Sequence, residues 1–266
     1  MNENKKEFKL ISKKNPKSLL PNTLTIFGVC LGLSSIKFAI DLNYSMAVIA
    51  IGFAAILDTL DGRVARLIKG TSKVGKELDS LTDVISFGVA PAFIMYFWQL
   101  NNLGKIGWLI SLIYVVCVAL RLARFNINTG GDSSWKDNFF EGVPSPAGGI
   151  LVLSPLIYEL SGFDFMNINY KLITPIIFVI ISILLISKIP TYSFKKIVVP
   201  RSTTIFLLFG IVLLFGLLLV FPFKVLAIGS IGYILLIPIS GVHFVKLKKN
   251  LKGDNNIEDK EPEDVL

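Results

Sequence analysis

The sequence predicts an all-α polytopic membrane protein with about eight transmembrane helices and both termini in the cytoplasm. Three observations lead to this fold class. Of the 266 residues, 53% are hydrophobic and only 17% are charged, and the mean hydropathy is +0.66. Apolar runs of about 20 residues recur along the chain, which is the length that an α-helix needs to cross a bilayer. Basic residues gather in alternate connections between these runs. This composition excludes a disordered chain, a disulfide scaffold and a water-soluble enzyme.

The expected spans follow from the apolar runs and from the charged or turn-forming residues that bound them. In chain order they cover residues 22–42, 46–66, 77–99, 104–126, 145–162, 170–189, 203–221 and 224–244. The 145–162 run is barely long enough to cross and begins in a Pro/Gly-rich stretch, so a tilted or irregular element is expected there. The membrane domain, 21–245, is preceded by a basic cytoplasmic segment, 1–20, and followed by a tail, 246–266, that is expected to be disordered.

Lysine and arginine residues fix the expected orientation. One side of the membrane holds 23 of the 27 basic residues, in the two termini and in the connections and helix ends after the second, fourth and sixth spans. The connections on the opposite side hold three. The richer side is expected to be cytoplasmic, which requires an even number of spans. The net charge of +8 therefore belongs to the membrane ends, and no nucleic-acid partner is expected. Cys30 and Cys117 lie inside apolar runs without metal-like spacing, as is typical of small core residues.

Four carboxylates interrupt the apolar pattern at one membrane depth. Asp58 and Asp61 lie near the cytoplasmic end of the second span, and Asp79 and Asp83 near the start of the third. Each pair shares a helix face, and the short 67–76 connection makes the two helix ends neighbours. Four negative charges in a low-dielectric site repel one another unless cations neutralise them. Oxygen ligands without histidine or cysteine favour Mg²⁺ or Mn²⁺, which commonly complete their shells with phosphate oxygens, so a phosphate-bearing substrate is expected.

Small and basic residues accompany the carboxylates. Gly62 and Gly75 remove side chains where a ligand must approach the backbone, Ala65 keeps the groove shallow, and Arg66 can pair with phosphate or carboxylate. Each residue alone is explained equally well by helix packing or a salt bridge. The complete eight-position spacing is not explained in that way.

This spacing, D-x2-D-G-x2-A-R-x8-G-x3-D-x3-D, resembles the signature of the CDP-alcohol phosphatidyltransferase family without a substitution. The resemblance implies a CDP-linked lipid donor, transfer of the phosphatidyl group to an alcohol with release of CMP, and a homodimer. It also implies two divalent ions, Mg²⁺ or Mn²⁺, held by the four carboxylates Asp58, Asp61, Asp79 and Asp83. The implied CDP-binding residues are Asn22, Gly62, Ala65, Arg66 and Gly75. Asn22 matches the family's Pro-Asn element and is equally well explained as a helix N-cap.

Three cytoplasmic segments, 121–126, 140–148 and 187–191, resemble the phosphatidylserine synthase branch of the family. This resemblance implies CDP-diacylglycerol as donor and L-serine as acceptor. A zwitterionic amino acid needs a cation for its carboxylate and hydrogen-bond acceptors for its ammonium group. The candidate acceptor-binding residues are Arg121, Arg124, Asn126, Glu141 and Ser145. Positive-inside anchoring explains each arginine equally well, and the Pro/Gly stretch could serve only to begin a helix.

The expected mechanism makes Asp83 the general base that removes the proton of the acceptor hydroxyl. The protein is expected to be an integral protein of a bacterial inner membrane, with its active site on the cytoplasmic side. The acyl chains of the donor are expected to stay in lipid. Two alternatives stay open. Glycerol 3-phosphate could be the acceptor, held by Arg121, Arg124 and Lys188. A divalent-cation transporter would also place carboxylates on facing helices, although near the bilayer midplane and open to both sides.

Overall fold

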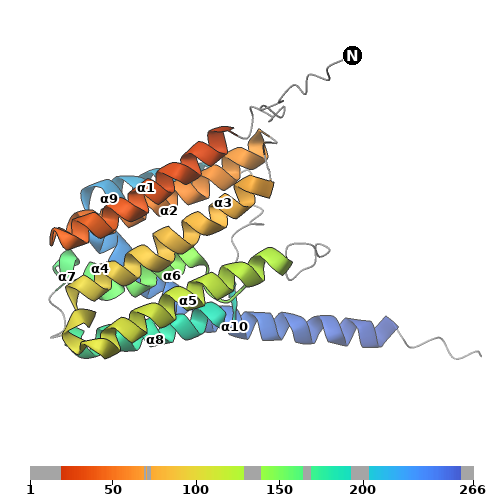
Figure 1. Ribbon diagram of the computed structural model, residues 1–266. Helices are drawn as coiled ribbons and strands as arrows, with labels where there is room; N and C mark the ends of the chain where they lie inside the picture. Colours follow the sequence, from red (N-terminus) through yellow and green to blue (C-terminus); the bar gives the residue numbers. More distant parts are fainter. Residues whose placement is uncertain are drawn as a thin grey trace, which may run out of the picture.

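The computed structural model describes residues 19–68, 70, 73–128, 139–163, 169–192 and 204–258. These residues are mostly helical, in agreement with the expected class (Figure 1). The elements are α1 (Leu19–Ile40), α2 (Tyr44–Leu67), α3 (Lys73–Asp83), the π-helical segment η2 (Val84–Val89), α4 (Ala90–Trp98), the 3₁₀ turn η3 (Leu100–Leu103), α5 (Lys105–Asn128), β1 (Phe139–Glu141), α6 (Ser145–Val152), α7 (Ser154–Ser161), α8 (Tyr170–Ile186), β2 (Pro190–Tyr192), α9 (Thr204–Val220) and α10 (Pro222–Glu258).

Five helical segments are long and apolar enough to cross a membrane. They are Leu20–Ile40, Tyr44–Leu67, Val74–Trp98, Lys105–Ile127 and Pro222–Phe244. The shorter apolar helices Tyr170–Ile186 and Ile205–Val220 lie at two more of the expected spans. The remaining expected span, 145–162, consists of the two short helices α6 and α7. Its break at Leu153 has a local cause, because Pro155 in the first turn of α7 has no backbone N–H to donate to the preceding turn.

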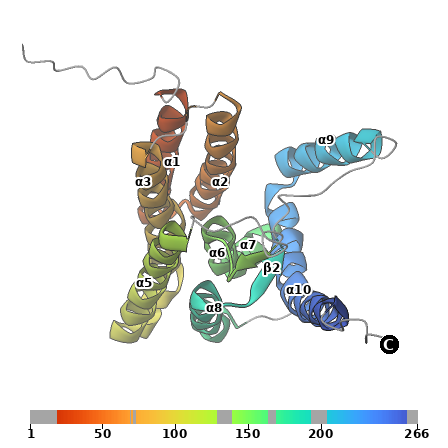
Figure 2. The same ribbon diagram turned by 90° about the vertical axis from the view of Figure 1, so that its right-hand side faces the viewer.

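Small residues let α1 approach the long helix formed by α3, η2 and α4. A Cβ atom at Gly32 would lie 2.6 Å from Ser86 Oγ and 3.0 Å from Ser86 Cα, so a larger residue would push the helices apart. Ser86 Oγ also donates a hydrogen bond to the backbone carbonyl oxygen of Gly28 (3.2 Å). α1 packs against both α2 and α3, which stand beside it in Figure 2. The end of α2 and the start of α3 therefore meet near the start of α1.

The segment η2 lies at the centre of the protein. Phe87 is fully buried, and its backbone carbonyl oxygen accepts a hydrogen bond from the Tyr114 hydroxyl on α5 (2.7 Å). The Tyr114 ring meets Phe178 on α8 edge-on, with 5.4 Å between ring centroids. A Cβ at Gly149 on α6 would lie 3.2 Å from the Phe87 backbone, so α6 also approaches closely. Contacts from α1, α5 and α6 thus fix the position of η2, which directly follows Asp83.

A two-stranded antiparallel sheet, the one sheet among the described residues, joins this core to α10. Phe140 of β1 lies opposite Thr191 of β2. Gly142 follows β1 with a φ of +74°, and a Cβ there would lie 2.8 Å from the Ser187 carbonyl oxygen. Both the left-handed backbone and the close approach require glycine. The Thr191 hydroxyl donates to the Gly142 carbonyl oxygen (2.7 Å). α10 packs on β2 and on α7 (Figure 2).

Helix α10 extends to Glu258, beyond the point at which the expected disordered tail begins. Residues 246–258 are thus helical, which differs from the expectation. The lysines and leucines of this stretch are good helix formers, and the preceding turns of α10 supply the nucleus that a new helix would lack. Residues 1–18 and 259–266 lie outside the described residues.

Candidate active site

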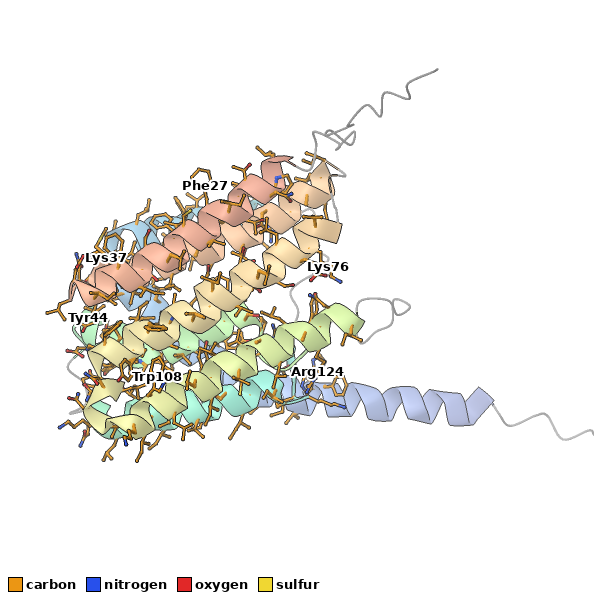
Figure 3. The ribbon with its side chains drawn as sticks, in the orientation of Figure 1. Phe27, Lys37, Tyr44, Lys76, Trp108 and Arg124 are labelled. Atoms are coloured by element: carbon orange, nitrogen blue, oxygen red, sulfur yellow. The ribbon has the colours of Figure 1, made fainter. Side chains whose placement is uncertain are left out.

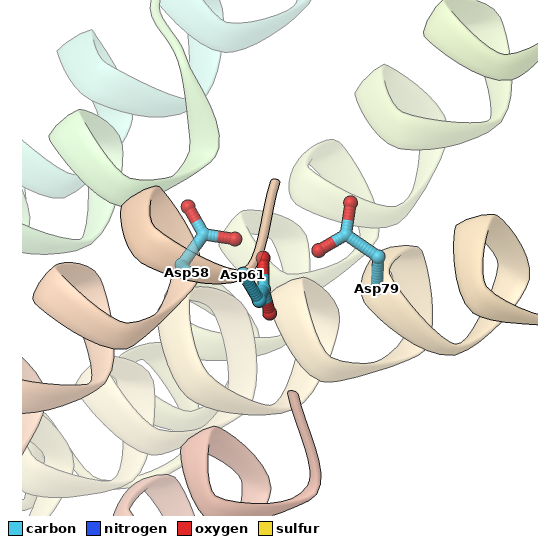
Figure 4. A group of neighbouring side chains, drawn as sticks. All are labelled: Asp58, Asp61 and Asp79. Carbon is cyan, nitrogen blue, oxygen red and sulfur yellow. The ribbon is translucent and has the colours of Figure 1, made fainter. Parts of the chain in front are cut away.

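Three carboxylates converge where α2 ends and α3 begins. Asp58 and Asp61 come from the last turns of α2, and Asp79 comes from α3. One ligand oxygen from each of the three lies within 4.8 Å of the others. Figure 4 shows Asp58 and Asp79 on either side of Asp61. The i, i+3 spacing on α2 and the close packing of α1 against both helices create this convergence.

Asp83 lies one turn further along α3, beside the cluster. Its carboxyl group is within hydrogen-bonding reach of Asp58, and it interacts electrostatically with Arg121 of α5. Asp83 Oδ1 is buried and has no hydrogen-bond partner among the described residues. The π-helical segment η2 begins at the next residue, and such segments occur frequently at functional sites.

The donor set fits a hard divalent ion. Carboxylates placed this closely in a site that is largely screened from water repel one another strongly, and a divalent ion removes that repulsion. Histidine and cysteine are absent from the cluster, and oxygen donors of this kind suit Mg²⁺ or Mn²⁺ rather than a soft metal. The residues that could hold such an ion are Asp58, Asp61 and Asp79, with Asp83 adjacent.

Thr25 is a site residue that the sequence reasoning did not single out. Its hydroxyl lies 2.7 Å from Asp61 Oδ2 and 3.0 Å from the Pro21 carbonyl oxygen. Asp61 is only 5% exposed, so this hydrogen bond orients a buried carboxylate. A signal was present, because Thr25 lies three residues after Asn22 and therefore on the same face of α1.

A cavity of about 170 Å³ opens beside the carboxylates. Its lining consists of small and polar residues from α1, α2, the connection after α2 and the start of α3, namely Pro21, Asn22, Thr25, Asp61, Gly62, Ala65, Gly70, Gly75, Lys76 and Asp79. Four of the five expected CDP-binding residues are in this set. The fifth, Arg66, is exposed, and its Nε donates to the Gly62 carbonyl oxygen (3.0 Å). Lys76 adds a positive charge that the sequence reasoning missed.

Gly62 offers a direct test of the cavity. A Cβ there would meet no protein atom within 4 Å, so the fold itself does not require glycine at this position of α2. Alanine has a helix propensity better by about 1 kcal/mol, and Gly62→Ala should not destabilise the protein. A methyl group in a filled ligand site costs about 1–3 kcal/mol, so the KM for the nucleotide donor should rise about tenfold.

Gly52→Ala is the matched control, because Gly52 lies in the same helix and its Cβ would also meet no atom within 4 Å. This variant should keep the KM of the wild-type protein. Thermal unfolding and initial rates of nucleotide release measure the two effects. An unchanged KM in Gly62→Ala would mean that the ligand does not approach α2 at this residue.

Of the expected acceptor-binding residues, Arg121 and Ser145 lie together, whereas Arg124 and Asn126 make other contacts. Arg121 Nη1 donates to Ser145 Oγ (2.6 Å), so these two lie together beside Asp83. Arg124 Nη1 instead donates to the Ile186 carbonyl oxygen (2.8 Å) at the C-terminal end of α8. A positive charge there interacts favourably with the helix dipole. Asn126 Nδ2 donates to Ser80 Oγ on α3 (2.9 Å). The side chain of Glu141 lies outside the described residues. Lys76 and Arg124 lie at the end of the protein opposite Tyr44 and Trp108 (Figure 3).

The fold and the site together define an integral membrane protein with an acidic cluster suited to divalent metal and a neighbouring cavity. The chain belongs to the CDP-alcohol phosphatidyltransferase family, whose model matches residues 18–237. This family is a family of phosphotransferases, and the match confirms the resemblance seen in the Asp58–Asp83 pattern.

Several proteins with similar sequences carry the same name. The chain is 35% identical over 225 residues to the CDP-diacylglycerol–serine O-phosphatidyltransferase of Mycobacterium tuberculosis (strain ATCC 25618 / H37Rv), a match that covers 84% of this chain and 78% of the relative. It is 40% identical over 183 residues to the protein of the same name from Helicobacter pylori (strain ATCC 700392 / 26695), covering 69% and 76%. The Mycobacterium leprae relative of that name is 40% identical over 185 residues, and the match covers 68% of this chain and 61% of the relative.

Proposed function

We propose that this protein transfers the phosphatidyl group of CDP-diacylglycerol to the hydroxyl of L-serine, giving phosphatidylserine and CMP in phospholipid biosynthesis. The observation that carries the proposal is the three-carboxylate cluster at the edge of a cavity lined by Asn22, Gly62, Ala65 and Gly75. Relatives named for this reaction support the choice of acceptor.

The donor would bind with its CDP group in the cavity and its acyl chains in lipid. Asn22, Gly62, Ala65, Arg66 and Gly75 would surround the nucleotide, and Lys76 would face its diphosphate. Arg66 is exposed beside the cavity, from where its guanidinium could turn from the Gly62 carbonyl oxygen to a phosphate oxygen. The absence of a side chain at Gly62 would let phosphate approach the α2 backbone.

Asp58, Asp61, Asp79 and Asp83 would hold two Mg²⁺ or Mn²⁺ ions. When bound, the ions would neutralise charge on the diphosphate and on the CMP leaving group. Asp83 would accept the proton of the serine hydroxyl while the serine oxygen forms a bond to the β-phosphorus of CDP-diacylglycerol. The bond from that phosphorus to the CMP oxygen would break, and CMP would leave with the electron pair. Arg121, Arg124, Asn126, Glu141 and Ser145 would surround the acceptor, with Arg121 and Ser145 nearest to Asp83.

The membrane topology is part of the same proposal. We place about eight spans in the membrane domain, 21–245, with the segments 1–20 and 246–266 in the cytoplasm. The asymmetry of 23 against three basic residues supports this orientation, in which the site would lie at the cytoplasmic side of the bacterial inner membrane. We further propose a homodimer, as the family resemblance implies.

CMP release by the purified protein tests the proposal. The protein in detergent would receive CDP-diacylglycerol and Mn²⁺ or Mg²⁺ with L-serine, glycerol 3-phosphate or inositol. Release should depend on metal and should occur with L-serine alone. Turnover with another alcohol would leave the metal site intact and refute the assigned acceptor. Uptake of divalent metal into proteoliposomes without CDP-lipid, together with no CMP release, would favour the transporter.

A further inference from the structure

Five buried side-chain polar atoms lack a hydrogen-bond partner among the described residues. Three of them come from three different helices and gather around Arg121, namely Asp83 Oδ1 on α3, Arg121 Nε on α5 and the Tyr233 hydroxyl on α10; the other two are Thr174 Oγ1 and Ser240 Oγ. Buried polar groups in folded proteins are almost always paired, because an unpaired one loses its bonds to water without replacement. Three such atoms in one place indicate a ligand that supplies the missing partners.

The charge of Arg121 interacts electrostatically with both Asp83 and Tyr233, which places the three side chains in one region of the protein. Ser145 fixes the guanidinium through its contact with Nη1 (2.6 Å), which leaves Nε to face another group. The Thr191 hydroxyl lies within hydrogen-bonding reach of the Tyr233 hydroxyl, but it donates its own proton to the Gly142 carbonyl oxygen (2.7 Å) and makes no well-formed hydrogen bond with Tyr233. Two hydrogen-bond donors, Arg121 Nε and the Tyr233 hydroxyl, thus lie close to the carboxylate that we assign as the base.

The position of Tyr233 follows from the packing of α10. The buried residues of this helix are Ala227, Ser230, Ile237 and Ser240, which repeat at helical spacing on one face. Tyr233 lies three residues after Ser230 and four before Ile237, so it shares that face. The face rests on β2 and α7, and the short sheet therefore carries α10 to the site. The family pattern in α2 and α3 gives no indication of this residue.

We propose that Tyr233 is an acceptor-binding residue: its hydroxyl and Arg121 Nε donate hydrogen bonds to the carboxylate of the amino-acid acceptor, whose own hydroxyl faces Asp83 Oδ1. The proposal rests on the proposed function. In serine the hydroxyl and the carboxyl group are attached to adjacent carbon atoms, so one small molecule can reach both sides of the cluster. Serine would supply an acceptor for each of the two donors and a donor for the unpaired carboxylate oxygen.

Selectivity follows from the same contacts. An alcohol without a carboxylate leaves Arg121 Nε and the Tyr233 hydroxyl buried and unpaired, and such sites reject the incomplete substrate strongly. Ethanolamine, which has the amine and hydroxyl of serine but no carboxylate, should therefore be a poor acceptor. L-serine methyl ester, whose carboxylate is masked, should be poor as well.

The test compares Tyr233→Phe with the wild-type protein in the CMP-release assay. Loss of one hydrogen bond to a charged group should raise the KM for L-serine about tenfold, with the KM for CDP-diacylglycerol unchanged. Tyr114→Phe is the matched control, because it also removes a buried hydroxyl, the donor to the Phe87 carbonyl oxygen (2.7 Å). This control should lower the unfolding temperature without raising the KM for serine.

Ethanolamine, used as a second acceptor, distinguishes a lost contact with the serine carboxylate from a general loss of enzyme activity. The Tyr233→Phe penalty should be present with serine and absent with ethanolamine. An equal loss with both acceptors, or an unchanged KM for serine in a folded variant, would overturn the proposal for Tyr233 alone. L-serine methyl ester tests the carboxylate contact in the wild-type protein. If the wild-type protein turned over the ester as fast as it turns over serine, the proposal would be overturned without any variant. A wild-type protein that uses no serine would refute the proposed function first.

Discussion

Asp83→Asn should lower CMP release by about 10³-fold while leaving the binding of CDP-diacylglycerol largely intact, because the three converging carboxylates of Asp58, Asp61 and Asp79 remain to hold metal. Asparagine has the shape of aspartate but cannot accept a proton from a serine hydroxyl at neutral pH. The change keeps the packing at the start of η2. It also removes the negative charge of Asp83, which lies close to the negative charge of Asp58. The fold should therefore be retained. CMP release at saturating serine and the rise in unfolding temperature with CDP-diacylglycerol measure the two properties.

Asp41→Asn provides the control for this variant. Asp41 pairs with Lys37 near the end of α1 opposite Asn22, and both side chains are well exposed. Exposed pairs of this kind contribute about 0–1 kcal/mol, so full activity is expected. Near-normal turnover in Asp83→Asn would show that another group is the base. Loss of donor binding together with turnover would instead assign Asp83 to the metal and donor site alone.

The sequence predicted the site where local spacing determines geometry. Asp58, Asp61 and Asp79 meet because helical periodicity and a short connection leave their two helix ends few other arrangements. Four of the expected CDP residues line one cavity for the same reason. Most of the expected spans coincide with helices, since about 20 apolar residues suffice to identify a crossing.

Tertiary contacts set the parts that the sequence did not predict. Thr25 reaches Asp61 only because α1 packs closely against its neighbours, and that contact spans 36 residues of chain. Tyr233 interacts electrostatically with Arg121 because α10 packs on the three-residue strand β2, and strands this short have no detectable periodicity. The π-helical segment after Asp83 is likewise a consequence of packing around Phe87.

Metal should reverse the order of stability of Asp61→Asn and the wild-type protein. The variant keeps an amide oxygen that can accept the hydrogen bond of Thr25 (2.7 Å in the native protein). It loses one of three charges whose oxygens lie within 4.8 Å of one another. Without metal, the relief of this repulsion should leave the variant at least as stable as the wild-type protein. With metal, the wild-type protein should be the more stable of the two.

The size of the effect follows from linkage. At a Mn²⁺ concentration of about 100 times the wild-type Kd, binding stabilises the folded state by about 2.7 kcal/mol. Loss of a carboxylate ligand should weaken binding about 100-fold, which leaves about 0.4 kcal/mol. Thermal unfolding with and without Mn²⁺ measures the difference, and Asp41→Asn should keep the full shift. A full shift in Asp61→Asn would show that Asp61 does not ligate the metal. A lost shift with unchanged CDP-diacylglycerol binding would separate the metal from the donor, which would contradict a site in which the ions neutralise the charge of the donor diphosphate.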